Sequence, residues 1–343
     1  DYRNPSNSKV ISALQELICD KDFCTLYSLF MLALARKELS ACSFRLFIGE
    51  KPNITSLMDE DLSTKPTEEE LKEALVDEWG VEYSKDGRKL LRVSRKLSGA
   101  YSVKEGTRII CDSAFYFCFL LEIVIPSSVT SIGDWAFSSC DSLSKIVIPS
   151  SVTSIGKGAF SYCDSLLEIV IPSSVTSIGD SAFYGCYSLS EIVIPSSVTS
   201  IADGAFSSCD SLSEIVIPSS VTRVGYGAFS FCSSLSEIVI PSSVTSIGKG
   251  AFSHCDSLSE IVIPSSVTSI GKGAFSHCDS LSEIVIPSSV TSIGDSAFSS
   301  CFSLSEIVIP SSVTSIGDSA FNNCKFPDNL KQELISRFGK KIF

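Results

Sequence analysis

The sequence predicts an α/β solenoid, in which short parallel strands and short helical or 3₁₀ turns stack into a curved array. Two observations predict this fold. From Cys118 onward the chain repeats every 23 residues: segments 237–259 and 260–282 are identical, and nine prolines recur at this spacing. The chain has 343 residues, enough for a long array, and 44% of them are hydrophobic, which excludes a disordered protein.

Each repeat contains a strand, a bend and a turn. In E-I-V-I-P the isoleucines alternate with Glu and Val, which is typical of a strand with one buried face, and proline ends the strand because it has no N–H group. In S-V-T-S-I-G, Val and Ile point inward and Gly is expected to permit a tight turn. A-F-x-x-C occurs ten times and places Ala, Phe and Cys inward. Only a stack of such units can bury a core.

The full motif, L-x-x-I-x-I-P-x-x-V-x-x-I-G-x-x-A-F-x-x-C, resembles the BspA-like class of leucine-rich repeats over residues 82–324. The resemblance implies a leucine-rich repeat solenoid over 119–324, preceded by a capping hairpin and first partial repeat over 81–118, with Asp86-Gly87 at the hairpin turn. Two departures from the motif, Ala202 for Gly and Lys145 for Glu, are expected to distort single turns without breaking the solenoid.

Both ends of the array are expected to be covered. Residues 325–343 predict a C-terminal capping helix with Asp328 as its N-cap and Leu330, Leu334 and Phe338 on the face toward the last repeat. Residues 1–80 predict a helical N-terminal region. It comprises two helices between Ser8 and Leu39 and a third that opens with a capping box at Thr67–Glu70 and continues through Trp79.

No residue is assigned to catalysis, to a metal or to a cofactor. The ten repeat cysteines predict a buried column of free thiols rather than disulfides, because identical environments do not favour disulfide geometry. The two histidines, His254 and His277, are expected one repeat apart, too few ligands for a firm metal site. The serines have no histidine and acid arranged as a triad, so the chain is predicted not to be an enzyme.

Charge limits the partners. Segment 119–324 carries 5 Lys/Arg and 18 Asp/Glu, which argues against nucleic acid. The longest apolar-rich run, 23–35, is too short to span a membrane. The chain starts at Asp1 rather than Met, so a secretion signal removed before Asp1 is compatible with it.

The predicted function is non-enzymatic protein binding by a monomer. The resemblance implies a cell-surface or secreted bacterial adhesin or host-interaction protein that binds a host matrix or surface protein. The alternatives are a cytoplasmic interaction scaffold and a polysaccharide-binding surface protein. Two surfaces are candidates for the partner. The first is a variable rim with Trp135, Tyr162, Tyr184, Tyr187, Tyr226, Phe231 and Phe302, and the second is a row of glutamates that includes Glu191, Glu214 and Glu237.

Overall fold

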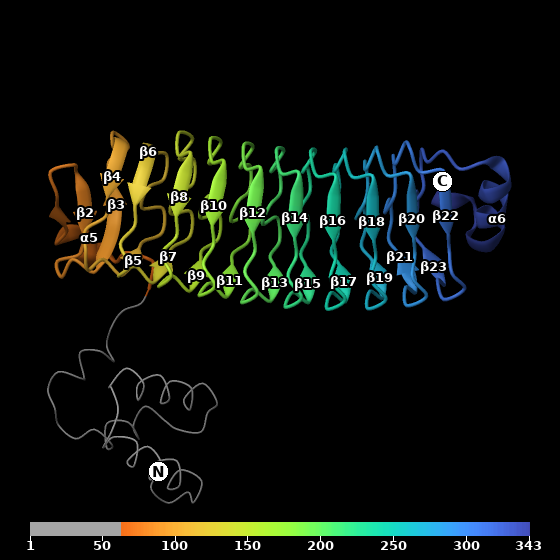
Figure 1. Cartoon of the computed structure of the whole chain (residues 1–343), viewed down its shortest axis with the longest axis horizontal. Helices are drawn as coiled ribbons and strands as arrows, with labels where there is room; N and C mark the ends of the chain where they lie inside the picture. Colours follow the sequence, from red (N-terminus) through yellow and green to blue (C-terminus); the bar gives the residue numbers. More distant parts are fainter. Residues whose placement is uncertain (1–62) are drawn as a thin grey trace, which may run out of the picture. The chain divides into compact units, whose positions relative to one another are not determined.

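Each 23-residue repeat forms one coil of a solenoid, and successive coils lie side by side along its length (Figure 1). The structure is a computed structural model that describes residues 63–343, so the two helices expected between Ser8 and Leu39 lie outside the described residues. Every regular coil contributes a three-residue strand, usually Glu-Ile-Val, and a two-residue strand, usually Ser-Ile. The exceptions are Lys-Ile-Val at 145–147 and Arg-Val at 223–224. Both pair in parallel with the next coil. The predicted leucine-rich repeat solenoid is confirmed.

The longer strands form a ten-stranded sheet, here called the long sheet. Its Ile residues are buried, whereas Glu and Val on either side are exposed, as the alternating pattern predicts. The strands are β4 (Ser98–Ser102), β6 (Phe119–Val124), β8 (Lys145–Val147), β10 (Glu168–Val170), β12 (Glu191–Val193), β14 (Glu214–Val216), β16 (Glu237–Val239), β18 (Glu260–Val262), β20 (Glu283–Val285) and β22 (Glu306–Val308).

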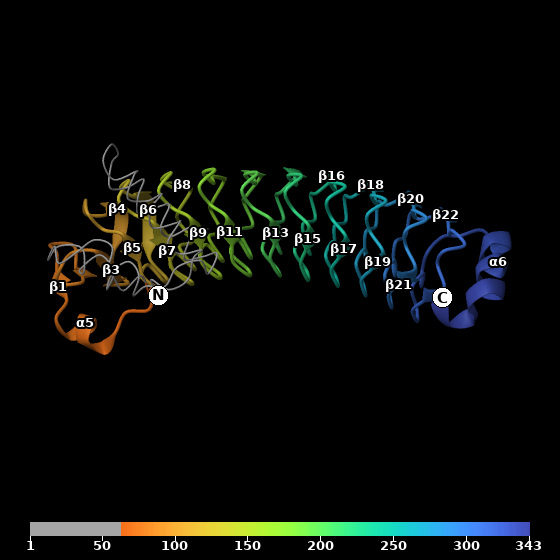
Figure 2. The ribbon, with the colours of Figure 1, turned by 90° about the horizontal axis from the view of Figure 1, so that it is seen from below.

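The short strands form two further sheets along a second side of the coils. The first contains β1 (Leu75–Val76), β2 (Val81–Tyr83), β3 (Lys89–Val93), β5 (Ile109–Ile110), β7 (Ser131–Ile132), β9 (Ser154–Ile155) and β11 (Ser177–Ile178). The second contains β13 (Ser200–Ile201), β15 (Arg223–Val224), β17 (Ser246–Ile247), β19 (Ser269–Ile270), β21 (Ser292–Ile293) and β23 (Ser315–Ile316). Figure 2 shows the same row of coils from below, with α6 (Asp328–Phe338) at its C-terminal end.

The glycine after each Ser-Ile strand is required by close approach between coils. A Cβ atom on Gly156 would lie 2.5 Å from the carbonyl carbon of Gly133, and one on Gly248 would lie 2.6 Å from that of Gly225. The expected tight turn begins at these glycines, since Gly156 O accepts from Ala159 N at 3.3 Å. Their φ angles are not positive, so the turn does not need glycine for a left-handed backbone. Only a residue without a side chain lets the backbones come this close.

Ala202 shows the effect of a side chain at this position. Within residues 63–343, the short-strand ladder is interrupted between β11 and β13, the strand directly before Ala202. Elsewhere the glycine N–H donates across the coils, as from Gly179 to Ile155 and from Gly225 to Ile201, each at 2.9 Å. The long sheet continues through the same coils, since β10 pairs with β12. The expected local distortion at Ala202 is therefore confirmed, and we attribute it to the Cβ atom, because a Cβ at the equivalent glycines would meet the backbone of the preceding coil.

Two of the side-chain columns in the core are the repeat phenylalanines and cysteines, which lie among buried Ile, Val, Leu and Ala residues. Ten phenylalanines from Phe115 to Phe321 stack with centroids 4.9–5.7 Å apart and ring planes within 9° of parallel. Beside them lie the ten repeat cysteines, all free and buried. From Cys140 onward each thiol donates to the carbonyl of a Phe in the preceding coil, as Cys232 does to Phe206 at 3.1 Å. Burial raises the pKa of Cys186 and Cys232 to about 12, so the thiols stay protonated.

The N-terminal cap begins with α5 (Glu68–Lys72). Its predicted capping box is confirmed: Thr67 Oγ1 accepts from Glu70 N at 3.1 Å, and Thr67 N donates to Glu70 Oε2 at 2.8 Å. The helix ends at Lys72, so the prediction of a helix through Trp79 is wrong. The following residues instead form β1, which pairs with β2. The hairpin of β2 and β3 turns at Gly87, with φ of 73°, as predicted.

The C-terminal cap is α6 followed by a 3₁₀ turn, η1 (Lys340–Ile342). Leu334 is buried, and Leu330 and Phe338 pack against the same core, as predicted. Pro327 is the N-cap and makes no side-chain hydrogen bond, so the prediction of Asp328 as the cap is wrong. The η1 segment takes the place of a further coil: Ser319 N donates to Lys341 O at 2.6 Å, and Phe321 N donates to Ile342 O at 2.8 Å.

Candidate binding faces

The third side of each coil is the segment G-x-x-A-F-x-x-C, here called the turn segment, and its four x residues are the variable positions one to four. The sequence predicts short helical or 3₁₀ turns here. The structure has hydrogen-bonded turns without a regular helix. Positions two and four have left-handed backbones, with φ of 52–62° and 56–70° respectively. Many are not glycine, for example Trp135, Tyr162 and Phe231, at a cost of about 1–2 kcal/mol each.

Hydrogen bonds between coils hold this backbone in place. The position-two N–H donates to the position-one carbonyl of the next coil, as Gly204 does to Tyr226 at 2.7 Å. The Phe N–H donates to the next Ala carbonyl, and the position-four N–H to the next position-three carbonyl. These N–H groups are therefore already hydrogen-bonded between coils, so a ligand can contact the turn segments mainly through their side chains.

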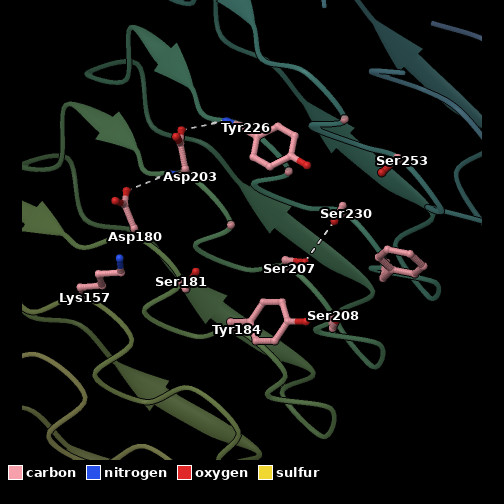
Figure 3. Close-up of a pocket in the computed structure, with 14 residues that line it drawn as sticks. Lys157, Asp180, Ser181, Tyr184, Asp203, Ser207, Ser208, Tyr226, Ser230 and Ser253 are labelled. Carbon is pink, nitrogen blue, oxygen red and sulfur yellow. Dashed lines mark hydrogen bonds between the residues drawn. The ribbon is translucent and has the colours of Figure 1, made fainter. Parts of the chain in front are cut away.

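A groove of about 680 Å³ lies on this side of the array (Figure 3). One wall consists of position-one residues, Lys157, Asp180, Asp203 and Tyr226. The other consists of position-three and position-four residues, among them Tyr184, Ser207, Ser208, Ser230 and Phe231. Position two provides the floor, where Ser181 is followed by Gly204, Gly227 and Gly250. The groove follows the solenoid axis because each wall is built from the same positions of successive coils.

The aromatic rings of the groove are braced by neighbours. The Tyr184 ring meets the ring of Tyr162 edge to face, with centroids 5.1 Å apart. A side-chain hydrogen bond with Tyr184 raises the pKa of Tyr162. Phe231 stacks on His254 at 4.3 Å. The Lys249 ammonium lies 5.2 Å from the centre of the Tyr226 ring. These contacts reduce the entropy that the rings lose when a ligand binds.

Carboxylates fix the first wall. Asp180 Oδ1 accepts from Asp203 N at 3.2 Å, and Asp203 Oδ1 accepts from Tyr226 N at 2.9 Å, as Figure 3 shows. Asp203 also pairs with Arg223 at 3.0 Å. An aspartate at position one therefore holds the position-one backbone of the next coil, and with it the side chain that this backbone carries into the groove.

Trp135 ends the glycine floor on the N-terminal side. A Cβ atom on Gly158 would lie 2.4 Å from the Trp135 ring, so the indole lies directly over the glycine of the next coil. Trp135 and Gly204 occupy the same position, with φ of 57° and 62°. The fold therefore accommodates either a large ring or a glycine at position two.

The second candidate face is the long sheet. Its Glu row is exposed, and Lys145 forms an ion pair with Glu168 within it. The Val row beside it, from Val124 to Val308, is 54–74% exposed. Because the sheet Ile and the turn-segment Phe enter one core from different sides, the Glu row and the groove face different directions. The long sheet presents almost the same two residues in each coil.

Comparison with known proteins decides the family. The BspA type leucine rich repeat region matches residues 100–213 and 199–331, with six copies. This chain belongs to the BspA-type leucine-rich repeat family. No curated protein matches it.

Several solved structures similar to this BspA-type chain come from bacteria. A leucine-rich repeat protein from Bacteroides ovatus is 26% identical over 79% of this chain and 89% of its own, with a TM-score of 0.47. A leucine-rich cell surface protein from Faecalibacterium prausnitzii is 30% identical over 74% of this chain and 92% of its own, with a TM-score of 0.38. A leucine-rich repeat protein of T. pallidum is 24% identical over 79% and 94%, with a TM-score of 0.34.

In this BspA-type array the predicted rim residues separate into two sets. Tyr184, Tyr226 and Phe231 line the groove, and Tyr162 and Trp135 adjoin it. Tyr187 and Phe302, which directly follow the repeat cysteines, are 40% and 42% exposed and lie outside the lining. Glu191, Glu214 and Glu237 lie on the long sheet.

The groove itself, with Gly204, Gly227 and Gly250 in its lining, is not predicted from the sequence. The signal was present as a second glycine in G-x-G-A-F and A-D-G-A-F, repeated in successive coils. It could not be interpreted without knowing that position two lies between two walls.

The two histidines stack on each other as neighbours in adjacent coils, with centroids 4.3 Å apart. Partial burial and the adjacent His277 lower the pKa of His254. Among residues 63–343, no three His, Cys, Asp or Glu side chains gather into a group able to hold a metal ion. In the same part of the chain, no helix is both long and apolar enough to cross a bilayer.

Proposed function

We propose that this protein is a non-enzymatic adhesion or host-interaction protein of a bacterial surface, and that it binds its protein partner with the turn segments rather than with the Glu row. Membership of the BspA-type family supports the surface location and the binding role. One observation supports the choice of face: braced, exposed aromatic rings converge on a groove at the turn segments. Such rings are the side chains that dominate binding energy at protein interfaces.

The Glu and Val rows offer less for recognition. A surface that is nearly the same in every coil cannot easily fix the position of an irregular protein epitope. Shifting the partner by one coil would leave its contacts with the sheet almost unchanged. The exposed charges are also screened by salt, which limits their contribution to affinity. The five turn segments that line the groove, from 156–163 to 248–255, all differ from one another and therefore define a position along this part of the array.

The test begins with capture of a partner from purified extracellular-matrix proteins by the full chain. Two variants are then compared for the protein that binds, Tyr226→Ser with Phe231→Ser and Glu191→Lys with Glu214→Lys. We expect the aromatic variant to weaken binding roughly 30-fold or more, since hot-spot residues contribute about 2 kcal/mol or more. Thermal unfolding of each variant controls for stability. Loss of binding in the charge variant alone would show that the Glu row is the binding face.

Location is tested separately from binding. Antibody labelling of intact and permeabilised bacteria should detect the protein on intact cells. Labelling that requires permeabilisation would favour the alternative, an intracellular interaction scaffold.

A further inference from the structure

We infer that the groove between Tyr184 and Phe231 binds a neutral oligosaccharide, one carried by the partner or by its surroundings. This inference rests on the proposed function, because it names the ligand of the same face. It is argued from the backbone, the spacing of the rings, the polar groups and the charge of the groove.

The backbone of the groove is not available to a peptide strand. The N–H groups of Gly204, Gly227 and Gly250 donate to carbonyls of the next coil at 2.7–2.9 Å. An extended peptide that binds by strand addition needs free N–H and C=O groups along an edge. A ligand of this groove must instead be recognised by side chains.

The rings are spaced for a ligand made of successive flat units. Tyr184 and the pair Tyr226 and Phe231 lie two coils apart, about 10 Å at the spacing of paired strands. The intervening coil has only small or short side chains at its variable positions, from Asp203 to Ser208. Figure 3 shows the rings of Tyr184 and Tyr226 broadside, with Ser207 between them.

These ring faces suit a sugar. An aromatic face carries partial negative charge, and the C–H groups on one face of a pyranose ring carry partial positive charge, so the two attract. Tyr226 is 53% exposed and Phe231 is 49% exposed, so each ring retains open surface after its bracing contact. A sugar chain along the axis can stack on the rings in turn.

The groove also offers polar groups at the spacing of the coils. Ser207 is only 6% exposed, and its hydroxyl lies 3.0 Å from that of Ser230. The line of position-three serines continues to Ser253, and Ser230 and Ser253 present the more accessible hydroxyls. Asp180 uses Oδ1 for the backbone of the next coil, and the structure gives its Oδ2 no partner among residues 63–343. Sugar hydroxyls both donate and accept, which matches a wall of hydroxyls and carboxylates.

Charge selects a neutral chain. In the groove itself, Lys157, Arg223 and Lys249 balance Asp180 and Asp203, so the selection comes from the array around it. The 119–324 array carries 18 acidic and only 5 basic residues. An anionic polysaccharide or a nucleic acid, which could also stack on the rings, would be repelled. A neutral oligosaccharide has no such cost.

The chain supplies a blocking variant. Gly204→Trp copies the residue at position 135, whose ring lies over the glycine of the next coil, and Gly204 is likewise followed by a glycine, Gly227. In the Gly204→Trp variant, the new indole should therefore fill the groove while the fold stays intact. The matched control is Gly273→Ser, outside the lining, which copies Ser296 at the same position with φ of 52°.

Calorimetry on the full chain would use cellohexaose, maltohexaose and chitotetraose as neutral probes and a hyaluronan hexasaccharide as the anionic one. We expect at least one neutral probe to bind, roughly tenfold or more weaker binding in Gly204→Trp and in Tyr226→Ser, and unchanged binding in Gly273→Ser. The anionic probe should not bind. The inference is overturned if no neutral probe binds, or if the blocked variant binds as well as the parent.

The protein partner separates this inference from the proposed function. If the aromatic variant loses the partner, and the partner binds equally after enzymatic removal of its glycans, the face is correct and the sugar inference fails. If a neutral probe is lost from Gly204→Trp while partner binding is unchanged, the sugar site is supported and the proposed protein-binding face fails.

Discussion

Replacing Phe229 by Ala should destabilise the array locally and strongly. Its ring is fully buried and lies 5.5 Å from the rings of both Phe206 and Phe252. A buried Phe side chain covers roughly 150–250 Å², which at about 25 cal/mol per Å² gives about 4–6 kcal/mol. Because the unfolded chain already buries part of this area, the expected loss is about 3–5 kcal/mol, as for other Phe→Ala cavities.

The loss should be confined to a few coils, since coils in a solenoid interact only with their neighbours. Hydrogen exchange followed by mass spectrometry should show faster exchange in the coil of Phe229 and in the two that stack against it. Urea unfolding followed by circular dichroism would give the overall loss of stability. The matched control is Val239→Ala in the same coil, because this side chain is 62% exposed and should change stability by about 0.5 kcal/mol or less.

The reasoning would be refuted if Phe229→Ala raised exchange uniformly from Ser102 to Cys324. It would also be refuted if the variant were as stable as Val239→Ala. The first outcome would mean that the array unfolds as one cooperative unit, and the second that the phenylalanine column is not what holds the coils together.

Four further predictions concern the thiols, alkaline pH, the gap at Ala202 and the C-terminal cap. The ten repeat cysteines should react with a thiol reagent only after unfolding, and a mass loss on reduction, showing disulfides in the column, would contradict this. Burial raises the pKa of thiols such as Cys232 from 9.0 to about 12, so their stabilising contribution is complete below pH 9 and is lost as the pH rises toward 12. The melting temperature should fall over that range, and a constant value would exclude the effect. Ala202→Gly should join β11 to β13 and slow exchange of the amide at residue 202, whereas unchanged exchange would mean that the Cβ atom does not cause the gap. Deleting residues 340–343 leaves the Ser319 and Phe321 N–H groups without acceptors and should speed exchange in the last coil but not near Phe160.

The sequence by itself determined the solenoid fold, the residues at which the repeats begin and end, and the residues of the core. Alternation of Ile with Glu and Val specifies which strand face is buried, and 23-residue recurrence places equivalent residues in register. The Phe and Cys columns therefore follow directly from A-F-x-x-C. These features depend on spacing along the chain, which a sequence displays.

Other features depend on how closely two coils approach, and only the tertiary structure decided them. The glycine after each Ser-Ile strand begins a turn, as the sequence predicts, but glycine is required there because a Cβ atom would meet the backbone of the preceding coil. The helix opened by Thr67 was extended through Trp79, but pairing of β1 with β2 outweighs the helical preference of that segment.

The candidate site, too, was predicted in part from the sequence and in part only from the structure. The sequence identified Tyr184, Tyr226 and Phe231 as exposed aromatics at variable positions, because variation within a repeat is visible in the letters. That these residues form the walls of one groove with a glycine floor was not visible. Tyr184 lies 42 positions before Tyr226 and 47 before Phe231, so these residues come into one groove only when the coils stack at strand spacing. The walls, the floor and the open ring faces are properties of that stack.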